Sequence, residues 1–168
     1  MPKIIENLPQ RLVEEASRQI HQDGYAAMTI RSVAKGCGVG VGTVYNYYAS
    51  KDELVAAFLL EDWHKCTRHI NAVSEASDTV RPVLEAIHTG LTRFAQAHAS
   101  VFQDESAAAA FSGSFSRYHS LLRSQIAAPL RKFSADDFTA EFIAEALLTW
   151  TVAGRSIEEI SSLVTKLL

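Results

Sequence analysis

The sequence predicts an all-α protein of about nine helices, with a three-helix helix-turn-helix domain over residues 1–50 and a larger helical domain over residues 51–168. Apolar residues recur at alternating steps of four and three, as in the stripe from Val80 to His98, and this is the period of a helix. Polar clusters that fit capping boxes precede several stripes, for example at residues 50–53 and 156–159. No segment alternates as a strand does, and no repeat is found.

The composition is that of a globular protein with a sizeable core, with 48% hydrophobic and 21% charged residues among 168. No apolar run has the length of a membrane-spanning helix, and the start of the chain lacks a secretory signal pattern. The only cysteines, Cys37 and Cys66, give no disulfide framework and are interpreted as free thiols. We therefore expect a cytoplasmic protein without a membrane contact.

The net charge of −3 is unevenly divided along the chain. Residues 1–52 hold six Lys/Arg and five Asp/Glu, a net charge of +1, whereas residues 53–168 hold ten and fourteen, a net charge of −4. The small positive share therefore lies with the predicted helix-turn-helix, and non-specific attraction to phosphate is expected to be modest.

The helix-turn-helix itself is predicted over residues 29–48. Thr29 is a natural N-cap for a first short helix, since its hydroxyl accepts an unpaired amide of the first turn. Gly38 lies where the chain must turn sharply, and Val44 is the apolar anchor of a second short helix that begins near Gly40. An ordinary helical hairpin is the alternative, but it leaves the coincidence of cap, turn glycine and hydroxyl-rich second helix unexplained.

The second short helix is too polar to be buried and too short to be stable alone, and duplex DNA is a suitable surface for it. Asn46 and Tyr45 are expected to read base edges, whereas hydroxyl groups and Lys51 are expected to hold phosphate oxygens. The predicted DNA-contacting set is Thr29, Arg31, Gly42, Thr43, Tyr45, Asn46, Tyr47 and Lys51.

Residues 11–58 resemble the DNA-binding domain of the TetR family of transcriptional regulators. The most specific match is GTVYNYYASKDEL, residues 42–54, close to the family pattern G-T-hydrophobic-Y-x-(Y/H)-F-x-x-K-(D/E)-x-L. Members often carry Ser and Lys where this chain has Gly40 and Val41, and Phe where it has Tyr48. The resemblance implies an effector-controlled DNA-binding regulator, most often a repressor, that binds a palindromic operator as a homodimer. The two lost contacts shift base reading to Tyr45 and Asn46.

Several local features of the other helices are also predicted. Asn7 or a nearby residue is expected to cap a first helix that ends at Gly24, a left-handed residue. A helix from residue 51 to about residue 71, and a single short helix over residues 100–111, are expected later in the chain. Pro129 is expected to distort the last turns of a helix over about residues 115–132.

The last two predicted helices, which open at Ser134 and Ser156, carry more apolar surface than one core needs. Completion of the monomer core is one interpretation. A twofold interface, in which these helices of two chains form a four-helix bundle, is the favoured one. The predicted interface residues are Trp150, Ile160, Leu163, Val164 and Leu167.

The second domain also has more aromatic residues than a small bundle requires. Ordinary core packing is the simple explanation, but together with a few polar groups these residues have the composition of a small-molecule pocket. The resemblance places an effector pocket between these helices, and no Arg or Lys lies on their apolar stripes, so a hydrophobic, weakly charged effector is expected. The predicted lining is Trp63, Phe94, His98, Phe102, Phe111, Tyr118 and His119.

No catalytic, metal or cofactor motif is found. His64 and His69 are five positions apart, off the i,i+4 spacing that would place both on one helix face. No serine lies in a nucleophile elbow, and the glycines of residues 36–42 form no phosphate-binding loop. Three hypotheses remain: an effector-controlled regulator, a TetR-like adaptor or nucleoid protein that acts through protein contacts, and an all-α enzyme or carrier, which has no positive support.

Overall fold

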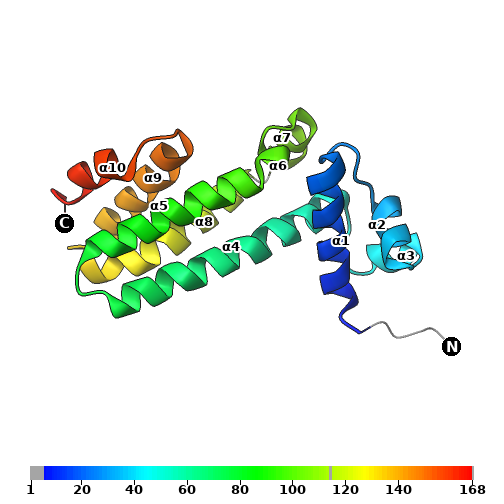
Figure 1. Ribbon diagram of the computed structural model, residues 1–168, viewed down its shortest axis with the longest axis horizontal. Coiled ribbons are helices and arrows are strands. Elements are labelled where there is room, and N and C mark those ends of the chain that lie inside the picture. The colour runs from blue at the N-terminus through cyan, green and yellow to red at the C-terminus, as the bar shows by residue number, and fades with distance from the viewer. Residues whose placement is uncertain (1–5, 114, 168) are drawn as a thin grey trace. The chain divides into compact units, whose positions relative to one another are not determined.

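The computed structural model describes residues 6–113 and 115–167, and its elements are helices, as predicted (Figure 1). No strand occurs within these described ranges. The elements are α1 (Leu8–Asp23), α2 (Ile30–Cys37), α3 (Val41–Tyr45), α4 (Lys51–Ala76), α5 (Val80–Ala97), α6 (Ala99–Phe102), α7 (Glu105–Phe111), α8 (Phe115–Leu130), the 3₁₀ helix η1 (Arg131–Phe133), α9 (Asp137–Val152) and α10 (Ile157–Val164). The all-α prediction is therefore confirmed.

Two helix ends follow from the predicted capping chemistry. The Thr29 side chain accepts from the backbone N–H of Ser32, and the Ser32 side chain accepts from the backbone N–H of Thr29, which makes a complete capping box for α2. At the other end of α2, Gly38 adopts the left-handed conformation with φ 69°. A side chain at that position would strain the turn into α3.

Other ends differ from the expectation. Asn7 precedes α1 with φ 54° and makes no side-chain capping bond. Gly24 ends α1 with φ 85° and ψ 164°, outside the left-handed helical region and in one that is essentially restricted to glycine. The single helix expected over residues 100–111 is two helices, because Asp104 interrupts it and caps α7 through the N–H groups of Ser106 (2.9 Å) and Ala107 (3.1 Å).

The later helices also begin and end differently. Helix α4 continues to Ala76, five residues beyond the expected end. Helix α9 is capped by Asp136, which accepts from Thr139 N–H at 2.7 Å, and so it begins later than Ser134 predicted. Pro129 lies inside α8, which ends one residue later and continues as η1.

The chain divides into two compact units. Unit 1 consists of residues 1–62 and 98–112, and unit 2 of residues 63–97 and 113–168. The helix pair α6 and α7 therefore belongs with α1, α2 and α3. Its Val101 and Ala107 lie in the same hydrophobic core as Leu12, Val33 and Val44.

Unit 2 is a bundle of α5, α8, α9, α10 and the second part of α4. Helices α8 and α9 pack most extensively on each other. Trp63 is fully buried in this bundle, and its indole N–H donates to the Gln125 side chain at 2.5 Å. The end of α4 is held by Lys132, whose ammonium donates to the carbonyl oxygens of Ser77 (2.6 Å) and Ser74 (3.2 Å).

Candidate DNA-binding interface

The α2–turn–α3 segment presents one buried anchor and an exposed polar edge. Val44 has no exposed surface and joins the unit 1 core. The residues that follow are solvent-exposed, with exposed fractions of 52% for Tyr45 and 48% for Tyr47, and Asn46 is exposed as well. Tyr45 and Tyr47 are large aromatic side chains that lie outside the hydrophobic core and are exposed to solvent, so their exposure needs an explanation. Hydroxyl and amide groups in this position suit the edges and phosphates of a nucleic acid.

Helix α3 is only five residues long and ends at Tyr45, with Asn46 at its C-cap. Asn46 and Tyr47 therefore lie on the turn that leaves the helix. Gly40 precedes α3 in an extended conformation and makes no side-chain cap. Thr43 is half-buried, whereas Gly42 is exposed.

Lys51 has partners inside unit 1. Its ammonium donates to the backbone oxygen of Tyr25 at 2.6 Å and lies 3.9 Å from the centre of the Tyr25 ring. Burial lowers the pKa of Lys51, although neighbouring carboxylates oppose that shift. Lys51 thus links the beginning of α4 to the loop between α1 and α2. An ammonium has three donors, so this link leaves capacity for a phosphate contact.

Tyr25 is a structural residue of the interface that the sequence interpretation did not single out. It is 3% exposed, and its hydroxyl donates to Asp52 at 2.5 Å. Burial, together with this carboxylate, raises the pKa of Tyr25. The ring therefore holds Lys51 and Asp52 in place at the first turn of α4. The only sign of this role in the sequence was the position of a tyrosine directly after Gly24, at the end of the first helix.

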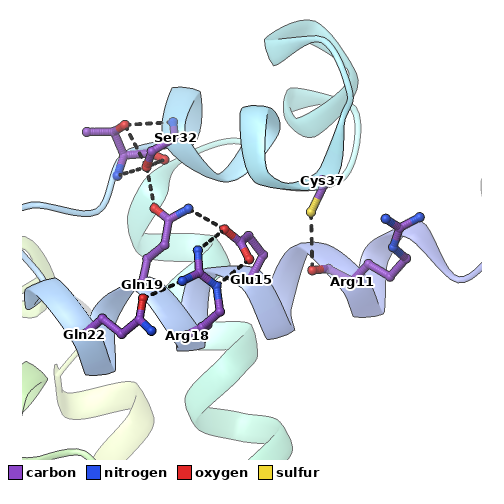
Figure 2. Close-up of polar contacts among 8 residues, drawn as sticks. Arg11, Glu15, Arg18, Gln19, Gln22, Ser32 and Cys37 are labelled. Atoms are coloured by element: carbon purple, nitrogen blue, oxygen red, sulfur yellow. Dashed lines mark hydrogen bonds and ion pairs between the residues drawn. The ribbon is translucent and has the colours of Figure 1, made fainter.

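A polar network joins α1 to the start of α2 (Figure 2). The Ser32 hydroxyl donates to the Gln19 side chain at 2.5 Å, and the Gln19 amide donates to Glu15 at 2.7 Å. The Thr29 hydroxyl, predicted to hold phosphate, accepts from Ser32 N–H at 3.0 Å. Neither Glu15 nor Gln19 was predicted to matter, although Gln19 interrupts the apolar stripe of α1.

The cysteines take no part in a disulfide. The helix-turn-helix part of unit 1, helices α1 to α3 and the start of α4, is called the head below. The thiol of Cys37 lies within it and donates to the backbone oxygen of Arg11 at 3.5 Å (Figure 2). Burial raises the pKa of this thiol, and burial also raises the pKa of the Cys66 thiol. A raised pKa means little thiolate at neutral pH, and so low reactivity.

The seven residues predicted to line an effector pocket are divided between the two units. Unit 1 contains His98, Phe102 and Phe111, and unit 2 contains Trp63, Phe94, Tyr118 and His119. Many of them pack within their own unit. The Trp63 and Phe94 rings meet edge to face at 5.3 Å, and Phe111 lies 6.4 Å from Tyr25.

His98 and His119 each face a carboxylate. His98 is 1% exposed, lies 4.7 Å from the Phe58 ring and has its Nε2 3.4 Å from Asp62. Burial lowers the pKa of His98 despite that carboxylate. In unit 2, Nε2 of His119 lies 3.4 Å from Glu145, which also faces Arg123 at 3.6 Å.

The predicted interface residues of α9 and α10 fall into two groups. Trp150, Leu163 and Leu167 are exposed by 50%, 64% and 50%. Ile160 and Val164 are instead buried in the unit 2 core of the single chain, away from the exposed face of α10. The reason is helical geometry, since residues four apart share the face of α10 that points inward. Phe138, Phe142 and Val152 of α9 are exposed as well.

Two kinds of site are not seen in the described part of the chain. None of the helices there is both long enough and apolar enough to cross a membrane. No group of three or more His, Cys, Asp or Glu residues among the described positions is arranged to hold a metal ion.

The fold and the exposed end of α3 define a helix-turn-helix protein of the DNA-binding class. Residues 12–58 match the family model described as "Bacterial regulatory proteins, tetR family". The match covers the N-terminal part of the chain, and together with the fold it supports a DNA-binding transcriptional regulator similar to those of the TetR family. Members of the family are generally non-enzymatic.

The chain is similar to a protein found by sequence and to two solved structures. The nucleoid occlusion factor SlmA of Actinobacillus pleuropneumoniae is 26% identical over 117 residues, which cover 58% of this chain and 58% of that protein. The chain thus spans less than two thirds of the length of this relative. Two solved structures share the fold at 19% identity. Salmonella enterica GusR has a TM-score of 0.68 (98% and 96% of the two chains), and Thermus thermophilus FadR, in complex with lauroyl-CoA, has 0.61 (95% and 92%).

Proposed function

We propose that the protein is an effector-controlled repressor that acts in the cytoplasm and binds a palindromic operator as a homodimer. The observation that carries the proposal is the exposure of Tyr45, Asn46 and Tyr47 around a buried Val44. Base choice belongs to Asn46 and Tyr45, and the phosphate contacts belong to the other members of the predicted DNA-contacting set. No catalytic activity is proposed.

The homodimer is supported by the outer faces of α9 and α10. Phe138, Phe142, Trp150 and Leu163 are at least half exposed and apolar. Burial of such surface is the main favourable contribution to stable association between protein chains. A second copy supplies a matching face by twofold symmetry, and two heads then engage two half-sites.

The proposed effector is a small, hydrophobic and weakly charged molecule. The fold is shared with a FadR in complex with lauroyl-CoA, and the apolar acyl chain of that ligand supports the hydrophobic character, although its coenzyme A part is strongly charged. Helix α4 begins in unit 1 and ends in unit 2, so a change at one end is transmitted along a continuous element. If the effector binds better to a state that binds DNA worse, each ligand lowers the affinity of the other by linkage.

A second candidate function is that of an adaptor or nucleoid protein without a small-molecule switch. The similarity to a nucleoid occlusion factor favours it. Gly40 and Val41 also offer fewer polar contacts to DNA than the Ser and Lys often found in the family. In this case the exposed apolar face of α9 would serve another protein as well as a second copy.

Selection from a pool of random duplexes, alongside duplexes from the protein's own upstream region, tests the proposal. Enrichment of a palindrome, together with release by members of a panel of apolar ligands that also raise the melting temperature, supports the repressor. Enrichment without any ligand response favours the adaptor. Binding of all duplexes with equal affinity contradicts sequence-specific regulation altogether.

A further inference from the structure

The interface between α1 and α2 contains a charged and polar chain of side chains where apolar packing would suffice (Figure 2). The Arg18 guanidinium donates to both carboxylate oxygens of Glu15, at 2.6 and 2.8 Å. The same carboxylate accepts from the Gln19 amide at 2.7 Å. Gln19 is only 8% exposed, so this amide is buried between the two helices and uses both of its ends.

The charge of Glu15 sets the direction of every bond in the chain. Hydrogen bonding from Arg18 lowers the pKa of Glu15, which therefore stays ionised and can only accept. The Gln19 Nε2 group must then face Glu15, and Gln19 Oε1 must face Ser32. The Ser32 hydroxyl consequently donates to Gln19, at 2.5 Å.

This direction determines what the Thr29 hydroxyl can do. Because the Ser32 hydroxyl uses its proton to donate to Gln19, Ser32 Oγ can act only as an acceptor towards Thr29. It accepts from the N–H of Thr29 at 3.0 Å and from the Thr29 hydroxyl at 3.1 Å. The proton of the Thr29 hydroxyl thus points into the cap of α2 and away from solvent. Without Gln19, the backbone oxygen of Thr29, at 2.8 Å, is the remaining acceptor for Ser32, and the arrangement loses its link to α1.

Gly36 makes room for this chain. It lies within α2, where a glycine weakens the helix, yet a Cβ at this position would overlap the Glu15 carboxylate. A buried polar link that replaces apolar contacts adds little stability, but it specifies one orientation of its partners. The absence of a side chain at Gly36 lets Glu15 keep its present position, and the buried Gln19 amide then fits a link that fixes the orientation of α2 on α1.

We propose that Gln19 is a positioning residue for DNA binding, which acts through Ser32 and Thr29 on the N-terminal end of α2. The inference rests on the proposed function, since it needs a DNA complex. Thr29, counted among the phosphate contacts in the proposed function, then acts by fixing the cap instead, and the exposed Arg31 beside it makes the phosphate contact at this end of α2. The network holds that contact in register with the base-reading residues of α3.

The test uses the full chain and the duplex that the selection enriches. Gln19→Leu and Ser32→Ala should each weaken binding about fivefold to tenfold, the effect of one lost hydrogen-bonded link. The loss should be equal for cognate and random duplexes, because phosphate contacts carry no sequence information. The double variant should lose no more than the weaker-binding single variant. Ser32→Thr keeps the hydroxyl and should bind like the original chain.

Val33→Ala is the matched control, because Val33 is fully buried on α2 and outside the network. It should lower the melting temperature more than Gln19→Leu and yet, well below that temperature, bind DNA normally. If affinity follows stability equally in all variants, or if Gln19→Leu binds as tightly as the original chain, the positioning role is wrong while the proposed function stands. If the original chain prefers no duplex, the proposed function fails and the inference fails with it.

Discussion

The exposed edge of α3 and the outer faces of α9 and α10 are both rich in large side chains, but they differ in polar groups. On α3 and the following turn, the exposed aromatics are tyrosines, and an asparagine lies between them. On α9 and α10, the exposed side chains include Phe138 at 76% and Leu163 at 64%, which have no polar atom. The first surface suits a partner with phosphates and base edges, whereas the second is stabilised only by exclusion of water.

The largest expected effect comes from a charge on the apolar face. Leu163→Glu should yield monomers, because a carboxylate in a desolvated interface is costly. Operator affinity should then fall by about 10²-fold or more, since the second half-site is no longer tethered. Sedimentation at micromolar concentration and a titration with the selected duplex measure both quantities.

Thr89→Glu places the same charge on an exposed position of α5 and should leave both quantities unchanged. If the original chain sediments as a monomer, or if Leu163→Glu remains a dimer with full affinity, the apolar face of α9 and α10 is not the dimer interface.

The polar surface is tested by Asn46→Ala. The change should relax base preference at one or two positions by about 1–3 kcal/mol, the value of a good bidentate contact. The free energy of unfolding should change by less than about 0.5 kcal/mol, because Asn46 is exposed. Selection with the variant measures the preference, and an unchanged preference would remove Asn46 from base reading.

Lys51→Met removes both the observed bond of the ammonium to Tyr25 and its proposed contact with phosphate, and two different measurements distinguish these losses. Loss of the bond to Tyr25 should lower the free energy of unfolding by about 1 kcal/mol. Loss of a phosphate contact should also lower the slope of log affinity against log salt by about one for every duplex alike. Lys51→Arg keeps the charge and should restore the slope. A variant that is less stable but has the original slope would show that Lys51 only supports the head.

The smallest expected effect is a pH dependence from His98 in unit 1. Burial holds the pKa of His98 below its ordinary value of 6.5, even though Asp62 opposes the shift and His21 adds to it. The unfolded state therefore binds the proton more readily, and stability is lost as the pH falls below 6.5 towards the lowered pKa. Thermal melts between pH 7.5 and 5.5, compared with those of His98→Phe, measure the contribution. A variant with the same pH dependence as the original chain would assign the effect to another group.

Features that depend on a few neighbouring residues were predictable. The cap at Thr29, the left-handed turn at Gly38 and the buried anchor Val44 were read from adjacent positions and are all observed. Each is a local requirement, since a hydroxyl must lie within one turn of the amide it accepts and a positive φ favours glycine. The exposure of Trp150, Leu163 and Leu167 also agrees with the leftover apolar surface that the sequence indicated.

Features that depend on which helix lies opposite were not predictable. Ile160 and Leu163 have the same chemistry, and only the packing of α10 on its neighbours buries the first and exposes the second. The grouping of α6 and α7 with the head likewise joins two segments that are separated in the chain by the 35 residues 63–97.

The sequence by itself therefore determined the all-α fold class, the cap of α2 and the TetR-like head, because these depend on interactions within a turn or two of the chain. The tertiary structure alone decided that Lys51 has a partner in Tyr25 and that Gln19 joins Arg18 and Glu15 to the cap of α2. The physical reason is that a side-chain hydrogen bond depends on distance and direction between helices, and neither is written in the spacing of residues along one helix.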